Sequence, residues 1–299
     1  MNKLLIIGGP TGIGKSEVAV RLAKRYNGIV IGADSMQIYK GMDIGTGKIR
    51  QEEMDGIFHA MIDIVEPDTE YSVQKYCQDA KQAIAAAHAG NRLPIVVGGT
   101  GLYIHALLNE QNFAEATPDP KIREKYWTIY REQGASRLHD LLQKVDEKSA
   151  EQIAVNDVKR CIRALEIYEQ TGRGKSETVA SGKCSYDVSF YVLQTEREQL
   201  YAKINRRVDH MFQSGLIDEV QNLQPFWDCH SMQAIGYKEV IAALRAGKDP
   251  DQVTDEIKQN SRRYAKRQIT FFKWIPFPKV YVAEDFYQNI TETSDTWWQ

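Results

Sequence analysis

In the first third of the chain, short apolar runs alternate with amphipathic stretches. Apolar runs at residues 3–8, 28–32 and 93–98 each end in glycine, which is typical of buried strands. Residues 15–26 place apolar side chains at helical spacing, and the alanine-rich residues 73–89 predict a second helix that stops at Gly90. Strands that alternate with helices predict an α/β fold, with a parallel sheet and ligands at the carboxyl ends of its strands.

The pattern changes near residue 112, where two prolines precede long charged stretches with helical periodicity and little strand character. We therefore expect an inserted helical subdomain at residues 112–200 and a core formed by residues 1–111 and 201–299. The clearest helix of the insertion lies within residues 156–172 and stops at Gly172. One apolar stripe runs along it, and its cations point away from that stripe: the stripe is Val158, Cys161, Ile162, Leu165 and Tyr168, and the cations are Lys159, Arg160 and Arg163.

The remaining C-terminal pattern predicts a return to the core. Residues 185–195 have the pattern of a strand, and residues 206–223 and 257–274 predict helices that pack back on the sheet. We expect the aromatic residues at the end of the last stretch, Phe271, Phe272 and Trp274, to belong to the core.

Composition narrows the setting without selecting a partner. The chain has 299 residues, with 38 Lys and Arg against 40 Asp and Glu, so any attraction to nucleic acid must come from local patches. Four scattered cysteines without a C-x-x-C pair are typical of a reducing compartment and argue against a zinc site. Because no apolar segment is long enough for export or for a membrane span, we expect a cytoplasmic protein without a membrane partner.

The strongest motif is a P-loop at residues 9–16, where a glycine is followed after four residues by Gly14, Lys15 and Ser16. It lies between a predicted strand and a predicted helix, as phosphate binding requires. Backbone N–H groups, the helix N-terminus and the Lys15 ammonium attract phosphate, and the Ser16 hydroxyl can hold Mg²⁺. The fold prediction is therefore a P-loop NTPase-like core. Two similar stretches, at residues 44–48 and 171–176, have Met42 and Glu169 where the first glycine is required, and we interpret both as loops.

Two further positions follow predicted strands at the same sheet edge. Asp34 and Ser35 follow the second strand, and a carboxylate there can hold a metal or accept a substrate proton. A turn-capping aspartate would have the same position in the sequence. Thr100 lies among Gly98, Gly99 and Gly101, which permit close approach of a ligand but also suit a tight strand-to-helix turn.

Three basic clusters are candidates for contact with a phosphate backbone. Residues 262–267 place two pairs of cations four residues apart on one predicted helix, Arg206 and Arg207 are adjacent, and the third cluster lies within residues 159–163. A solvated helix face would have the same pattern. The six histidines lack metal-ligand spacing.

Together, the stretches GGPTGIGKS, ADSMQIY, GMDIGTGK, VVGGTGLY, RALE, IGYKE and RRYAKRQITFF, in this order, resemble the tRNA dimethylallyltransferase family. The resemblance implies a P-loop core with a helical insertion that binds the tRNA anticodon stem-loop. It also implies that the P-loop holds the diphosphate of dimethylallyl diphosphate with Mg²⁺, and that the product is N6-dimethylallyladenosine beside the anticodon. We expect a compact enzyme of the bacterial type, acting as a monomer.

The resemblance also implies roles for particular residues. Asp34 matches the general base that takes the N6 proton, with Thr100 and Lys15 at the reacting centre. The diphosphate-binding residues would be Gly9, Pro10, Thr11, Gly12, Ile13, Gly14, Lys15 and Ser16, with Ser16 as metal ligand. The tRNA-binding residues would be Asp34, Ser35, Met36, Gln37, Thr100, Arg123, Lys159, Arg160, Cys161, Ile162, Arg163, Gln233, Gly236 and Lys238.

This sequence departs from the family pattern at three places. GIGKS replaces the common ASGKT, GTGKI replaces the common GTAKP, and FHAMID has one of two frequent histidines. Serine in place of threonine keeps the metal-binding hydroxyl. Two other functions are compatible with a P-loop: a small-molecule or nucleoside kinase, and an RNA-binding ATPase that transfers no prenyl group.

Overall fold

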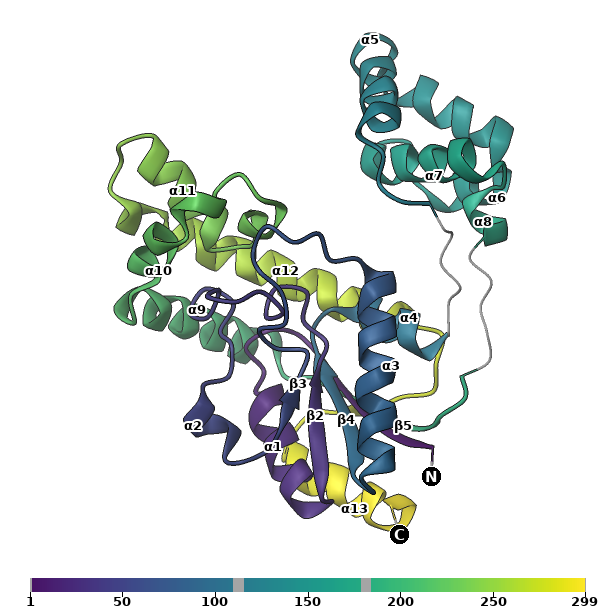
Figure 1. The fold of residues 1–299 in the computed structure, drawn as a ribbon. Helices are drawn as coiled ribbons and strands as arrows, with labels where there is room; N and C mark the ends of the chain where they lie inside the picture. Colours follow the sequence, from purple (N-terminus) through teal and green to yellow (C-terminus); the bar gives the residue numbers. More distant parts are fainter. Residues whose placement is uncertain (1, 110–115, 179–183, 299) are drawn as a thin grey trace. The chain divides into compact units, whose positions relative to one another are not determined.

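The computed structural model of this protein describes residues 2–109, 116–178 and 184–298. The chain forms two compact units (Figure 1). Unit 1 comprises Met1–Leu107 and Ser185–Gln299, and unit 2 comprises Leu108–Cys184. The insertion expected at residues 112–200 therefore ends earlier than its predicted boundary, because the strand that follows Ser185 pairs with the N-terminal strand and so belongs to the core.

Unit 1 contains a parallel six-stranded sheet in the order β3-β2-β4-β1-β5-β6. Its strands are β1 (Lys3–Gly8), β2 (Gly28–Gly32), β3 (His59–Ala60), β4 (Leu93–Gly98), β5 (Asp187–Leu193) and β6 (Val280–Val282). In the central pairs, Gly8 lies opposite Gly98 on one side and Val192 on the other. The carboxyl ends of β1, β4 and β5 therefore meet at one edge, as predicted from the alternation of strands and helices.

Helices cover the sheet because β1, β2 and β4 carry apolar side chains toward both faces. Leu5 and Ile7 pack in a cluster with buried residues of α1 (Lys15–Arg25) and α13 (Phe286–Trp298). The alternate residues Leu4 and Ile6 are also fully buried. α3 (Val73–Ala89) contacts β2 and β4, and its buried residues lie outside the α1 cluster.

The C-terminal helices form a second apolar cluster beside the sheet. α9 (Arg197–Gln213) and α12 (Thr254–Trp274) contact each other and extend from the sheet cluster into this second one (Figure 1). α10 (Leu216–Asn222) and α11 (Tyr237–Arg245) complete it, together with Ile38, Tyr39 and Met42 from the loop after β2. The expectation that residues 206–223 pack on the sheet is thus wrong for α10, which packs on that loop.

The remaining elements of unit 1 are short. They are α2 (Gln51–Met54), α4 (Gly101–Leu108), η1 (Gln224–Phe226), η2 (His230–Gln233) and η3 (Pro250–Val253). Of the three aromatics at the end of α12, Phe272 is buried as expected, but Trp274 is 62% exposed. The prediction that Trp274 belongs to the core is wrong, because Trp274 comes two positions after the buried Phe272 and therefore lies on a different side of α12.

Unit 2 is helical and has its own apolar core. Its helices are α5 (Pro120–Val145), α6 (Glu147–Gln152), α7 (Val158–Thr171) and α8 (Lys175–Thr178). The predicted stripe of α7 is confirmed for Cys161, Ile162 and Leu165, which are buried in the core of the unit, whereas Val158 and Tyr168 are only half-buried. Gly172 ends α7 in the left-handed conformation, with φ of 67°.

Within residues 2–109, 116–178 and 184–298, no helix combines the length and apolar character of a bilayer span. In the same ranges, no group of three or more His, Cys, Asp or Glu side chains is arranged to hold a metal ion.

Candidate active site

The P-loop, residues 9–16, connects β1 to α1 and depends on glycine for its backbone shape. Gly9, Gly12 and Gly14 have φ angles of 144°, 77° and 104°, a region that favours glycine. A Cβ on Gly9 would also lie 2.9 Å from the Leu193 carbonyl oxygen. Because α1 starts at Lys15, the loop directs the free N–H groups of a helix N-terminus toward its concave side, as anion binding requires.

Lys15 supplies the positive charge of this loop. Its Nζ donates a hydrogen bond to the Pro10 carbonyl oxygen at 2.8 Å, which folds the side chain back over the loop. Burial lowers the pKa of Lys15 to about 8, while the Asp34 carboxylate opposes the shift and Arg207 adds to it. The ammonium is therefore charged at neutral pH and poorly solvated, which strengthens its attraction for an anionic ligand.

Asp34 lies just beyond the end of β2. Its Oδ1 accepts a hydrogen bond from the Met36 backbone N–H at 2.9 Å, so the turn-capping role considered above is present. Within the described residues, this is the one hydrogen bond of the carboxylate, and the residue lines a cavity of unit 1. The second oxygen is thus available to a ligand. Asp34 can therefore cap the turn through Oδ1 and present its other oxygen to the cavity.

Thr100 and Gln268 join the strand ends to one another. Thr100 Oγ1 accepts the Ser35 N–H at 3.0 Å and so ties the turn after β4 to the turn after β2. Buried Gln268 of α12 accepts the Thr11 N–H at 2.9 Å and donates to the Gly99 carbonyl oxygen at 3.0 Å. These bonds fix the P-loop, Asp34 and α12 relative to one another within unit 1.

The cavity has a volume of about 360 Å³ and lies between the strand ends and the C-terminal helices. The predicted site residues that line this cavity are Thr11, Asp34, Ser35, Met36, Gln233 and Lys238. Arg207 of α9 also lines it, donating to Thr11 Oγ1 at 2.9 Å and to the Thr46 carbonyl oxygen at 2.7 Å. Burial lowers the pKa of Arg207, and the Asp34 carboxylate opposes that shift.

Tyr264 of α12, the helix that carries the basic cluster of residues 262–267, also lines this cavity. Burial, followed by the Asp34 carboxylate, raises the pKa of Tyr264 to about 12, so its hydroxyl is protonated at neutral pH. Arg267 also lines the cavity, with its guanidinium 5.6 Å from the Tyr264 ring centroid. The basic helix is therefore part of the cavity wall and not simply a solvated face.

The residues at the P-loop suit a magnesium ion held together with a ligand. Mg²⁺ usually keeps several waters and takes one or two protein oxygens together with phosphate oxygens. Exposed Ser16 provides one such hydroxyl at the N-terminus of α1, next to Lys15. This donor set fits a diphosphate-bound Mg²⁺ better than a resident metal held by protein side chains alone.

The predicted RNA-binding residues of unit 2 fall into two groups. Lys159 and Arg160 are exposed on α7, whereas Cys161 and Ile162 are buried in the core of the unit. A direct side-chain contact of Cys161 or Ile162 with RNA is thus excluded by their burial. Arg123 and Arg163 both pair with the fully buried Glu166 carboxylate, and Arg163 also donates to the Ala116 carbonyl oxygen at 2.8 Å.

The family of this chain follows from its similarity to known proteins. The IPP transferase family model matches residues 37–274, and the isopentenyl transferase model matches residues 2–65. The chain belongs to the IPP transferase family. Among curated family members, the tRNA dimethylallyltransferase of Caldanaerobacter subterraneus is 45% identical over 300 residues, covering 97% of this chain and 95% of the relative. That of Oceanobacillus iheyensis is 44% identical over 274 residues, covering 90% and 88%.

Solved structures of the family have the same fold. The tRNA isopentenylpyrophosphate transferase of Bacillus halodurans is 42% identical, with a TM-score of 0.73 over 99% of this chain and 95% of that one. A eukaryotic dimethylallyltransferase captured acting on tRNA is 29% identical, with a TM-score of 0.79 over 99% of this chain and 77% of that one. The parallel sheet with flanking helices is therefore the fold of this family.

Sequence reasoning missed several polar residues of the site. Tyr264 and Gln268 lie four residues apart in the basic stretch of α12, with Lys266 and Arg267 between them. In the sequence, Arg207 stands out only as one member of a basic pair. A residue with a polar side chain on the buried stripe of a helix is the pattern that could have found Gln268, which is 5% exposed.

Proposed function

We propose that this chain transfers the dimethylallyl group of dimethylallyl diphosphate to N6 of adenosine 37, beside the anticodon, in tRNAs that read codons beginning with U. The products are N6-dimethylallyladenosine and diphosphate. The observation that carries this proposal is one cavity lined by the Asp34 carboxylate, the Arg207 guanidinium and Thr11 of the P-loop. A proton acceptor and a cationic anchor for a leaving group face the same space there.

The P-loop acts on the leaving group. When the C1–O bond of the donor breaks, negative charge develops on the diphosphate oxygens, and Lys15, Arg207 and the P-loop N–H groups would stabilise it. Mg²⁺ held by the Ser16 hydroxyl would neutralise further diphosphate charge. The remaining P-loop residues serve by shape, with Gly9, Pro10, Gly12, Ile13 and Gly14 forming the concave backbone.

Asp34 acts on the nucleophile. The N6 amine of adenine forms a bond to C1 of the dimethylallyl group, and the Asp34 carboxylate accepts the proton that N6 loses. Its second oxygen is available for this role because Met36 N–H engages only Oδ1. Thr100 holds Ser35, the residue after Asp34, by accepting a hydrogen bond from the Ser35 N–H. General-base assistance of this kind contributes about 10²- to 10⁴-fold to rate.

The target adenine must leave its stack for N6 to reach Asp34, and this is least costly for an unpaired loop nucleotide. Ser35 and Met36 line the cavity beside Asp34, and Gln37 donates to the Thr46 and Gly47 carbonyl oxygens at 3.3 Å each. Gln233, Gly236 and Lys238 belong to the segment that forms another part of the cavity wall.

In unit 2, Lys159 and Arg160 have the exposure needed for contact with RNA phosphates. A monomer suffices for this chemistry, because all residues of the cavity belong to unit 1.

The direct test is incubation of the purified protein with unmodified tRNA and dimethylallyl diphosphate labelled in the prenyl group, with Mg²⁺ and without ATP. We expect label in tRNA, at the adenosine beside the anticodon, with release of diphosphate. A tRNA with guanosine at that position is the matched control and should remain unlabelled.

Two results would contradict the proposal. ATP-dependent phosphorylation of a small molecule without tRNA labelling would indicate a kinase. ATP hydrolysis stimulated by RNA, again without prenyl transfer, would indicate an RNA-binding ATPase.

A further inference from the structure

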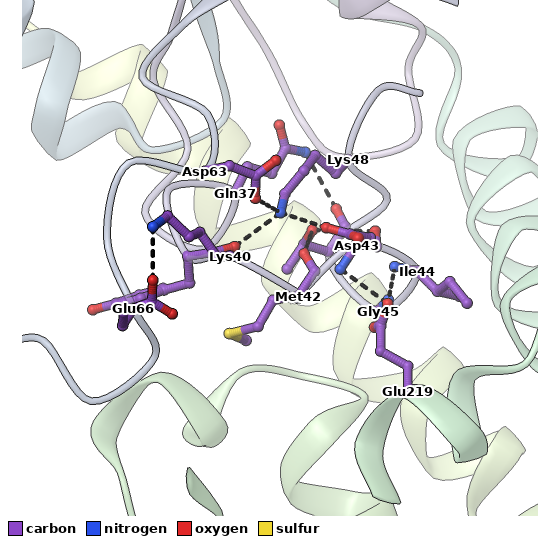
Figure 2. A network of polar contacts seen from close by, with 12 residues as sticks. Gln37, Lys40, Met42, Asp43, Ile44, Gly45, Lys48, Asp63, Glu66 and Glu219 are labelled. Carbon is purple, nitrogen blue, oxygen red and sulfur yellow. Dashed lines mark hydrogen bonds and ion pairs between the residues drawn. The ribbon is translucent and has the colours of Figure 1, made fainter. Parts of the chain in front are cut away.

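The glycine-containing turn at residues 43–46 has its backbone N–H groups bound by a carboxylate of the protein itself. Glu219 Oε2 accepts the N–H groups of Asp43 and Ile44 at 3.0 and 2.7 Å, and Oε1 accepts that of Gly45 at 3.0 Å (Figure 2). The sequence of this turn resembles a P-loop, and consecutive N–H groups of this kind form an anion site. Here the anion is the side chain of Glu219 on α10.

The same carboxylate is held from its other side. Tyr237 donates its hydroxyl to Glu219 Oε1 at 2.6 Å, and the fully buried Tyr237 ring packs so closely on the turn that a Cβ on Gly45 would overlap it. Burial and the Glu219 carboxylate raise the pKa of Tyr237, so the hydroxyl remains a donor. With three backbone donors and one hydroxyl, both oxygens of Glu219 are occupied.

Lys48, a buried lysine two residues after the turn, ties the turn to neighbouring segments. Lys48 is 9% exposed, and its Nζ donates to the Tyr39 carbonyl oxygen at 2.8 Å and pairs with the Asp43 carboxylate at 2.5 Å (Figure 2). It also pairs with Asp63. The turn is therefore held by Glu219 and Lys48, two side chains that lie outside the cavity.

The turn at residues 43–46 also holds Arg207. The Thr46 carbonyl oxygen accepts Arg207 Nη2 at 2.7 Å, while Nη1 of the same guanidinium reaches Thr11 of the P-loop. A Cβ on Gly47, which has a φ of 56°, would overlap the guanidinium, so the guanidinium lies directly against the turn. One connected series of contacts thus runs from Glu219 through the turn and Arg207 to the P-loop.

From this series we propose that Glu219 is a positioning residue of the prenyl transfer reaction, which sets the orientation of the Arg207 guanidinium toward the leaving diphosphate. Glu219 does not line the cavity, whereas Gly45 and Thr46 do. It acts through the backbone of the turn and touches no substrate. This inference rests on the proposed function.

The test compares Glu219→Gln with Asp218→Asn in prenylation of unmodified tRNA. Both changes remove a carboxylate from the first turn of α10, but Asp218 makes no side-chain hydrogen bond within the described residues. Glutamine can accept at only one of the two atoms, so either the Asp43 and Ile44 N–H groups or the Gly45 N–H and the Tyr237 hydroxyl lose their acceptor. We expect kcat to fall about 10- to 100-fold for Glu219→Gln, as for a displacement of a catalytic group by about 1 Å. The Kd for tRNA should stay within a few-fold, and Asp218→Asn should behave as the unaltered protein.

A second comparison asks whether the effect passes through Arg207. In an Arg207→Lys background the bidentate link between turn and P-loop is already lost, so adding Glu219→Gln should change kcat less than two-fold. An equal loss in both backgrounds, or a Glu219→Gln variant that matches Asp218→Asn in kcat, would overturn the inference.

Tyr237→Phe guards against a misfolded Glu219→Gln protein. It removes one donor to Glu219 and leaves the ring, and we expect a loss of a few-fold in kcat that disappears in the Arg207→Lys background. A loss that persists there contradicts the proposal. If the unaltered protein transfers no prenyl group, the proposed function fails and not the positioning role alone.

Discussion

The carboxylates of Asp34 and Glu166 occupy two regions that are built in opposite ways. Asp34 in unit 1 lines a cavity, and Met36 N–H provides its one hydrogen bond within the described residues. Glu166 in unit 2 is fully buried and accepts from the Asp119 N–H, Arg123 and Arg163. A carboxylate with an open oxygen and cationic neighbours can do chemistry, whereas a saturated one can only hold a structure together.

The largest effect should come from the unsaturated carboxylate. Asp34→Ala removes the proposed base, and we expect turnover to fall about 10²- to 10⁴-fold while the tRNA Kd changes only a few-fold. Single-turnover prenylation and tRNA titration measure the two quantities. Asp218→Ala, which removes an exposed carboxylate outside the cavity, is the control. Turnover near that of the unaltered protein would remove Asp34 from the base role.

The saturated carboxylate should affect stability instead. Glu166→Ala leaves two arginines without their partner, and we expect a loss of about 2 kcal/mol in the free energy of unfolding. This is below the value for a wholly buried pair, because Arg123 and Arg163 are 41% and 34% exposed. Denaturant unfolding measures it. A variant of unchanged stability would show that the pairs contribute nothing net.

The same site predicts an acid dependence of stability. Burial alone would raise the pKa of Glu166, but the Asp119 N–H and the two arginines outweigh burial and lower it. Since the folded pKa lies below the unfolded one, the stabilisation is present above the ordinary glutamate range and is lost as the pH falls through the folded pKa. Unfolding of the Glu166→Ala variant should therefore be less sensitive to acid than that of the unaltered protein.

A smaller effect should follow the charge of Lys15. Its pKa of about 8 in the free protein means that the ammonium loses its proton at mildly alkaline pH. We expect kcat/KM for dimethylallyl diphosphate to fall above about pH 8 and the Lys15→Arg variant to lack this decline, since arginine stays charged. A flat profile through pH 9.5 in the unaltered protein would contradict the assigned role of Lys15.

The smallest effect concerns the exposed cations of unit 2. Lys159→Gln with Arg160→Gln should weaken tRNA binding and reduce the slope of log K against log salt by roughly 1 to 2. Arg163 is unsuitable for this test because it pairs with Glu166. Lys125→Gln, which removes a cation paired with Glu169, is the matched control. An unchanged slope would return Lys159 and Arg160 to the role of a solvated face.

Local sequence was sufficient for the P-loop, the parallel sheet and the helix of residues 158–171. These features depend on short-range rules: glycine at positive φ, strand and helix periodicity, and helix stops such as Gly172. The same rules placed Asp34 and Thr100 at one sheet edge, because parallel strands end together. They could not show that Arg123 and Arg163 share a buried partner, since Glu166 lies 43 residues from Arg123 in the chain.

What the sequence alone determined is therefore the P-loop and the side of the sheet where it lies, because a glycine-rich loop between a strand and a helix carries its own geometry. Only the tertiary structure decided which polar residues complete the site. Arg207, Glu219, Tyr264 and Gln268 come from helices far along the chain, and their roles depend on which backbone groups they meet after packing. A hydrogen bond between distant segments leaves no local periodicity, so a helical pattern can mark Gln268 as a buried polar residue but cannot reveal its partners.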